Sequence, residues 1–273
     1  MGNRCHMQRL PESCYIDGNL MDRLAPMNLP QPTPENERVL NEARTWFRDR
    51  VIASHVENTR NLIHASSFNI NPFTVWYLAR FIDGEVTPLS IAKALVLPRS
   101  MGTSIATSFG SQMQRFITDT LATAFGSPAS GMDIEFKDFY DGHKKHSQIK
   151  LGPNTINRDD VTTIDSKFKS LRNLLRTNGV SLPSDRFVVA VMFGEPNEVN
   201  AFYQSLRDEH GWELLVGREF WAHLTGDDYF HDRLVEVIRE STEESDSSDV
   251  LAETLSTLAK DPEIIALSNQ YQR

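Results

Sequence analysis

Hydrophobic residues in the first half of the chain recur at helical spacing. Between residues 35 and 63 they repeat every three or four positions while arginines occupy other faces, which predicts one long amphipathic helix. Prolines directly after Asn71 and Thr87 mark further helix starts, because proline is tolerated in the first turn of a helix. These two signals predict helices near 72–82 and 88–96, and a further apolar stripe predicts a helix over 103–124.

The period changes to alternation in the middle of the chain. Residues 132–139 and 145–151 alternate polar and apolar side chains, as expected for two strands that each bury one face. Asp141-Gly142 lies between them and is a strong signal for a tight hairpin turn. The sequence therefore predicts a β-hairpin.

The pattern after the hairpin predicts further sheet and helix. Residues 187–193 form an uninterrupted apolar run, which favours a buried central or parallel strand. We expect a helix over 162–177 before this strand, and a helix over 197–209 and a short strand around 214–216 after it, as in a βαβ unit. Closing helices are predicted near 217–224, 229–243 and 249–259. The expected fold class is α/β (α+β): a central mixed β-sheet with a hairpin, flanked by helices, with helix-rich N- and C-terminal parts.

The chain divides unevenly into a leader and one domain. Five prolines fall within residues 1–35, a spacing that prevents regular structure and predicts a poorly ordered leader or arm. We expect residues 36–273 to form a single domain. We expect a helical segment over 36–126, an α/β core over 127–216 and C-terminal helices over 217–273.

Charge is distributed unequally along the chain. The formal net charge of −9 argues at first against a nucleic-acid ligand, since lysine and arginine normally neutralise phosphates. However, residues 186–273 hold 7 basic and 18 acidic side chains, which leaves 21 basic and 19 acidic side chains in residues 1–185. Between Asp141 and Arg176 there are 8 lysines and arginines against 4 aspartates. Duplex DNA therefore stays among the candidate ligands of this segment.

Membrane and secreted classes are not supported. No apolar run reaches the roughly 20 residues that a membrane span needs, and none follows Arg4 and Arg9 as in a secretory signal. Cys5 and Cys14 lie in the leader and provide no disulfide framework. These features predict a cytoplasmic protein that does not enter a membrane.

The predicted hairpin gathers polar side chains on one face. If Asp141-Gly142 are the central residues of a two-residue turn, Asp133 pairs with Lys150 and Glu135 pairs with Gln148. Directly opposed side chains share a face of a sheet, so these four side chains would project together. A longer turn would shift the pairing but keep the side-chain parity within each strand.

Two histidines flank the predicted turn. His143 and His146 are three residues apart, so a hairpin would place them on opposite faces. We expect both to be solvent-exposed rather than a metal-binding pair.

These residue types suit phosphodiester hydrolysis. That reaction needs a hard divalent cation, oxygen ligands to hold it and a cationic group near the attacking water. Asp133, Glu135 and Gln148 offer the oxygens for Mg²⁺, and Lys150 offers the amine. The alternative is an ordinary solvated hairpin face in which Asp133 and Lys150 form a cross-strand ion pair.

Candidate DNA contacts follow the second strand. Residues 151–157 are rich in glycine, proline and short polar residues, and they lead into the predicted helix. Such strand ends are common ligand sites in α/β sheets, and these side chains could contact phosphates or base edges. The candidates are Asn154, Thr155, Asn157, Lys167 and Arg172.

An aspartate on one strand followed by Gln148-Ile149-Lys150 on the next resembles the PD-(D/E)xK nuclease pattern, in a variant with glutamine first. The chain also resembles type II restriction endonucleases of the PmeII type and, more distantly, enzymes that cut sites such as RGGNCCY. The resemblance spans roughly 70–240 and is carried by Ile70–Phe73, Leu97–Gly102, Gln148–Asn154, Val188–Gly194 and Gly217–Trp221.

The resemblance implies a restriction-endonuclease-like fold and Mg²⁺-dependent, site-specific cleavage of double-stranded DNA. It makes Asp133, Gln148 and Lys150 the catalytic residues. One hydrolytic centre per chain implies a homodimer for cutting both strands. It also implies a cognate methyltransferase in the same restriction-modification system, though not as a stable partner.

Gln148 departs from the acidic consensus. A neutral oxygen binds Mg²⁺ less strongly than a carboxylate, so Glu135 or an acid from a neighbouring helix, such as Asp119, would compensate, or the site would be weak or inactive. The alternatives are a repair or recombination nuclease of the same superfamily and a DNA-binding module with a decayed nuclease site. A scaffold protein without DNA affinity is the third.

Overall fold

The structure is a computed structural model that describes residues 30–127, 131–243 and 247–271. Most of the expected leader, residues 1–29, lies outside the described residues. Pro32–Arg273 form one compact unit.

Helices occupy the first third of this unit, as the spacing predicts. The expected long helix is formed by α1 (Pro34–Trp46), the π-helical segment η3 (Phe47–Ile52) and α2 (Ala53–Arg60), which follow one another without a break. It begins at Pro34 because the Thr33 hydroxyl accepts a hydrogen bond from the Asn36 N–H. After the short η4 (Ala65–Ser67), the chain continues through α3 (Val75–Asp83), α4 (Pro88–Pro98), η5 (Arg99–Ser104) and α5 (Ile105–Thr120).

A five-stranded mixed sheet follows, in agreement with the predicted fold class. Its spatial order is that of the chain: β1 (Ala124–Gly126), β2 (Ile134–Lys137), β3 (Lys144–Lys150), β4 (Phe187–Val191) and β5 (Glu213–Val216). β1, β2 and β3 pair antiparallel, whereas β3, β4 and β5 pair parallel. β1 was not predicted, because its three residues adjoin the breaker Gly126-Ser127-Pro128 and carry no alternation of their own.

The hairpin forms, but the predicted register is wrong. The observed pairs are Ile134 with Ser147 and Glu135 with His146, so neither Asp133 with Lys150 nor Glu135 with Gln148 is a cross-strand pair. The turn is longer than two residues, because the Asp138 N–H donates to the His143 carbonyl at 2.9 Å and closes a loop of four residues. This lengthening shifts each pairing by two positions and leaves the side-chain parity unchanged.

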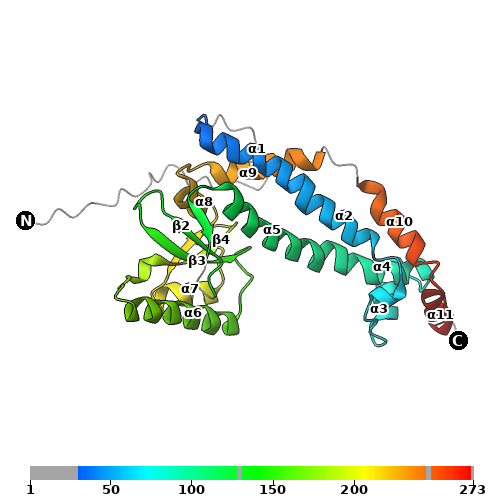
Figure 1. The fold of residues 1–273 in the computed structure, drawn as a ribbon. Helices are drawn as coiled ribbons and strands as arrows, with labels where there is room; N and C mark the ends of the chain where they lie inside the picture. The colour runs from blue at the N-terminus through cyan, green and yellow to red at the C-terminus, as the bar shows by residue number, and fades with distance from the viewer. Residues whose placement is uncertain (1–29, 128–130, 244–246, 272–273) are drawn as a thin grey trace, which may run out of the picture. The chain divides into compact units, whose positions relative to one another are not determined.

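Helices cover both faces of the sheet (Figure 1). α6 (Arg158–Thr177) and α7 (Ala201–Asp208) pack on one face through a core that includes Phe168, Phe187 and Val189. The other face packs on α1, α5, α8 (Arg218–Thr225) and α9 (Phe230–Glu243). The short η6 (Ser184–Arg186) leads into β4. Both faces of β4 are therefore buried, which explains its uninterrupted apolar sequence.

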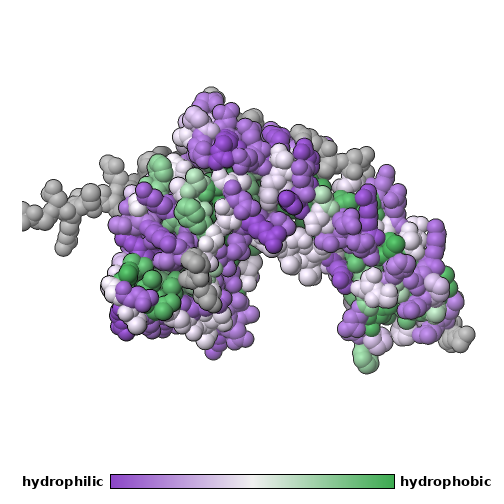
Figure 2. Space-filling model, viewed as in Figure 1, coloured by the Kyte–Doolittle hydropathy of each residue, from purple (hydrophilic) through white to green (hydrophobic). Residues whose placement is uncertain are grey.

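A third core lies among helices that carry no site residue. It joins α3 and α4 to α10 (Ser248–Leu258) and α11 (Pro262–Tyr271), and α11 was not predicted. Hydrophilic side chains cover much of the face seen in Figure 2, with hydrophobic ones reaching the surface over α3. No helix among the described residues has the length and apolar character needed to cross a membrane.

Gly217 joins the sheet to α8 in a way that only glycine permits. Its φ is +52°, and a Cβ there would lie 2.2 Å from the Gly194 carbonyl oxygen. Its N–H donates to Val191 at 2.8 Å, and the Trp221 indole donates to Met192 at 2.9 Å. The segment Gly217–Trp221 therefore anchors a helix start to the sheet.

Candidate active site

The structure brings Asp133, Gln148 and Lys150 to one face of the sheet at one end of the hairpin. Asp133 directly precedes β2, and its N–H donates to the Ser147 carbonyl at 2.9 Å. The observed register puts Asp133 opposite Gln148, and Lys150 follows two positions further along β3. Because alternate residues share a face, all three side chains lie on the side covered by α6.

Asp133 is a partly buried carboxylate. Its Oδ2 accepts the Ile149 N–H at 2.7 Å, and within the described part of the chain Oδ1 accepts no hydrogen bond. Burial raises the pKa of Asp133, and the Ile149 hydrogen bond and the charges of Lys167 and Lys150 only partly offset this effect. The site therefore holds a carboxylate with a free oxygen, whose burial the neighbouring lysines only partly offset.

Gln148 and Lys167 border this carboxylate. The Gln148 side-chain amide donates to the Gly131 carbonyl, which leaves its own oxygen without a partner among the described residues. The aliphatic part of Lys167, from α6, passes over Gly131, where a Cβ would lie 3.0 Å from its Cγ and Cδ. The predicted DNA-contact residue Lys167 is thus at the site.

Lys150 faces the start of α6. Its Nζ lies 3.5 Å from Oδ1 of Asp160, and both side chains are partly shielded from solvent. Asp160 was not predicted as a site residue. The signal available in the sequence is the capping pattern Asn157-x-x-Asp160, which marks a helix start but not its neighbour on β3.

Glu135 lies on the same face of β2, two residues closer to the hairpin turn than Asp133, and its carboxylate already has partners. Its carboxylate contacts Lys144, lies 3.1 Å from Nδ1 of His146 and accepts a hydrogen bond from Ser127 at 3.0 Å. Burial disfavours the charged form, but the hydrogen bonds from Lys144 and Ser127 outweigh it and hold the pKa of Glu135 below its usual value. Glu135 is thus a buried ion-pair partner in this structure.

The prediction that His146 is solvent-exposed was wrong. The side chain lies within the sheet face, where its ring stacks on Phe187 with centroids 5.7 Å apart. Its parity on β3 places it under α6, which the hairpin alone could not reveal. His143, in the turn, is exposed as predicted.

The predicted DNA-contact residues divide into two groups. Asn154 and Arg172 are exposed, whereas Thr155 and Asn157 have structural contacts. The Thr155 hydroxyl donates to Gly152 at 2.9 Å, and Asn157 Oδ1 accepts the first N–H groups of α6. Asn154, Lys167 and Arg172 therefore keep side chains available for DNA.

One further polar contact ties the site to α5. The Gln114 side-chain amide donates to the carbonyl of Asp133 at 3.0 Å. Sequence spacing carries no signal for this contact, because α5 and β2 meet only in the folded chain. Gln114 therefore helps to set the backbone position of Asp133.

A second buried charged cluster lies at the opposite end of β3. Lys145 Nζ lies 2.8 Å from Glu213 and 3.0 Å from Asp141, and Asp138 lies 2.7 Å from His223. Burial alone would lower the pKa of Lys145, but the hydrogen bond to Glu213 and the neighbouring carboxylates raise it above its usual value. This cluster keeps its charges paired and holds the hairpin turn against β5 and α8.

The described residues offer oxygen ligands rather than a ready-made metal cluster. None of them form a group of three or more histidine, cysteine, aspartate or glutamate side chains suited to a metal ion. Asp133 Oδ1 and the Gln148 amide oxygen are nevertheless hard donors without partners, the kind that Mg²⁺ prefers. The donor set therefore fits a hard divalent cation with few protein ligands.

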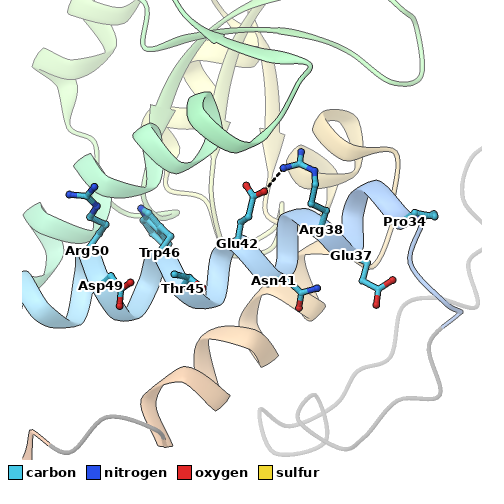
Figure 3. Close-up of a pocket in the computed structure, with 9 residues that line it drawn as sticks. All are labelled: Pro34, Glu37, Arg38, Asn41, Glu42, Thr45, Trp46, Asp49 and Arg50. Carbon is cyan, nitrogen blue, oxygen red and sulfur yellow. Dashed lines mark hydrogen bonds and ion pairs between the residues drawn. The ribbon is translucent and has the colours of Figure 1, made fainter.

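A hollow of about 780 Å³ lies elsewhere, along α1 and η3. Figure 3 shows the lining side chains along this helix, with Arg38 and Glu42 paired one turn apart on it. None of the residues of the hairpin site line it. The candidate site is thus separate from this hollow.

A comparison with protein families identifies the family of this chain. A family model described as Type II restriction endonuclease EcoO109I matches residues 89–246, a stretch that contains all five strands and helices α5 to α9. No curated protein sequence matches the chain. Because the matched segment covers more than half of its length, the chain belongs to the EcoO109I family of type II restriction endonucleases and is a DNA-cleaving hydrolase.

Proposed function

We propose that this restriction endonuclease hydrolyses phosphodiester bonds of double-stranded DNA at defined sequences, with Mg²⁺, at the Asp133–Lys150 site. The observation that carries the proposal is the shared face of Asp133, Gln148 and Lys150 at one end of the hairpin. This arrangement supports the PD-(D/E)xK variant that the sequence suggests, whereas the PmeII-like relationship rests on the sequence resemblance alone.

Each side chain has a distinct part in this proposal. Asp133 and the Gln148 amide oxygen would hold Mg²⁺, which polarises the scissile phosphate and activates a water molecule. Lys150 would orient that water or stabilise charge on the phosphate with its amine. Glu135 would join as a second carboxylate only by giving up its contact with Lys144.

Cations from α6 would hold the DNA backbone near the reacting bond. Lys167 lies beside Asp133, and exposed Arg172 is on the same helix. Asn154, Thr155 and Asn157 lie in the loop between Lys150 and α6, where Asn154 is the freest to meet a base edge. The local positive charge offsets the acidic C-terminal part of the chain.

We also propose that the chain acts as a homodimer through the α3 surface, which we define as Phe73, Tyr77 and Phe81. These side chains are 92%, 66% and 75% exposed. Tyr77 and Phe81 lie one turn apart on α3 with ring centroids 6.0 Å apart, and Phe73 lies in the turn that precedes the helix. A two-fold axis beside Tyr77 would let each copy cover the exposed aromatic side chains of the other.

Tyr77→Glu is expected to convert the dimer to monomers, because it buries a charge at the centre of the α3 surface. Sedimentation equilibrium measures the change, and Val235→Glu, at an exposed position of α9, is the matched control. A wild-type protein that is monomeric, or a dimer that survives Tyr77→Glu, would contradict this surface.

Digestion of unmethylated phage DNA tests the main proposal. The protein with Mg²⁺ is expected to yield discrete fragments, and an excess of EDTA is expected to leave the DNA intact. A smear of fragments would favour a repair or recombination nuclease without a fixed site. Binding without cleavage would favour a decayed nuclease centre.

The cellular setting follows from this activity. An enzyme that cuts defined duplex sites has its substrate in the cytoplasm, where it would also threaten the host chromosome. We therefore propose a cytoplasmic protein accompanied by a methyltransferase that protects the same sequence without binding the nuclease stably.

A further inference from the structure

We propose that Asp160, in the first turn of α6, is a positioning residue for Lys150. It fixes the amine at the end of β3 and supplies there the negative charge that the neutral Gln148 does not provide. This inference rests on the proposed function, in which Lys150 acts on the reacting phosphate or water.

The contact itself is direct. Asp160 Oδ1 lies 3.5 Å from Lys150 Nζ, and the two side chains are 33% and 23% exposed. Lys150 makes no other ion pair within the described part of the chain. The nearby Asp133 acts on Lys150 only through its charge, so Asp160 is the group that can hold the amine in place.

Asp160 is itself held firmly. Its Oδ2 accepts the Asn157 N–H at 3.0 Å, and its own N–H donates to Asn157 Oδ1 at 3.1 Å. This reciprocal capping box restricts rotation of the carboxylate, and the helix N-terminus favours its negative charge. One oxygen therefore caps α6 while the other faces the lysine.

The helix that carries Asp160 is anchored on the same sheet as Lys150. Val161, Ile164 and Phe168 of α6 are buried in the core that contains Val189 and Val191 of β4. β4 pairs with β3, and Lys150 aligns with Val191. The spacing between the start of α6 and the end of β3 is thereby set by packing.

Lys150 has a flexible four-carbon side chain with several rotamers. Only some of these rotamers direct the amine toward the face that holds Asp133. A fixed carboxylate beside the amine selects among them. Loss of that carboxylate would leave DNA binding intact but reduce the fraction of Lys150 in the reactive position.

Asp160→Asn tests this inference, because asparagine still accepts the Asn157 N–H but loses the charge. Under Mg²⁺, kcat is expected to fall on the order of 10- to 100-fold while KM for DNA stays the same. Asp160→Glu, which keeps the charge, is expected to retain most of the activity. Asp159→Asn, an exposed neighbour in the same turn, is the matched control and should change kcat less than about twofold.

Wild-type kcat in Asp160→Asn would overturn the inference, and so would an equal loss in Asp159→Asn or in Asp160→Glu.

A thermal double-mutant cycle of Lys150→Met and Asp160→Asn tests the pair without cleavage. The Tm losses are expected to be non-additive by on the order of 1–2 °C, and additivity would overturn the inference. A wild type that does not cut DNA contradicts the proposed function instead, while the cycle still reports on the pair.

Discussion

Asp133→Asn is expected to reduce cleavage of duplex DNA by at least about 10³-fold. The proposed site loses a carboxylate that has one oxygen free for Mg²⁺, and with it several kcal/mol of charge stabilisation. The same change should not lower the stability of the fold. Burial raises the pKa of Asp133, so its charge is unfavourable in the folded protein, and the asparagine oxygen can still accept the Ile149 N–H. Active sites commonly retain such unfavourable groups for function.

Single-turnover cleavage and thermal unfolding of the same preparations measure the two effects. Asp208→Asn, which removes an exposed carboxylate at the end of α7, should leave both unchanged. Rapid cleavage by Asp133→Asn, or its unfolding, would contradict the assigned role.

Cleavage by the wild type should also depend on pH. Without metal the pKa of Asp133 is raised, so protons should compete with Mg²⁺ for this carboxylate from a higher pH than at an ordinary aspartate. The carboxylate is charged above the raised pKa, and as the pH falls through it the Mg²⁺ concentration needed for half-maximal cleavage should rise.

Lys145→Ala is expected to destabilise the fold by about 3–5 kcal/mol, because it leaves buried carboxylates without their cation. The Lys145 side chain is 2% exposed, and its amine lies 2.8 Å from Glu213 and 3.5 Å from Asp138. For a domain of this size the loss corresponds to a fall in Tm on the order of 10 °C. Denaturant titration and thermal unfolding both measure it.

Two variants separate charge from volume in this cluster. Lys145→Met keeps most of the side-chain volume and should cost nearly as much as Lys145→Ala, whereas Lys137→Ala, at an exposed position of β2, should change stability by less than about 0.5 kcal/mol. Without the ammonium, the pKa values of Asp138 and Glu213 rise above those in the wild type. The stability deficit is therefore full above these raised pKa values and shrinks as the pH falls through them. A deficit that is independent of pH would contradict the electrostatic explanation.

The common face of Asp133, Gln148 and Lys150 could be predicted, but the pairing of the strands could not. Side chains alternate along a strand whatever the turn does, so parity follows from the sequence alone. The turn length depends on Asp138, which accepts the Tyr140 N–H and is tied to His223 of α8, 85 positions further along the chain. That contact exists only when α8 lies against the hairpin.

The carboxylate that lies beside Lys150 could not be predicted from the sequence either. The sequence offered Glu135 and Asp119 as compensating carboxylates, because they lie on the predicted strand and on a preceding helix. In the structure, Glu135 is engaged by Lys144, and Asp160 is the carboxylate next to Lys150. Whether Glu135 also serves a metal stays a prediction.

By itself the sequence determined the types of most elements, the mixed sheet and the shared face of the hairpin, because local periodicity and turn chemistry act within a few residues. Only the tertiary structure decided the strand register, the burial of His146 and the approach of Asp160 and Gln114 to the site. These contacts join segments whose spacing along the chain has no period, so their geometry arises from how helices pack on the sheet.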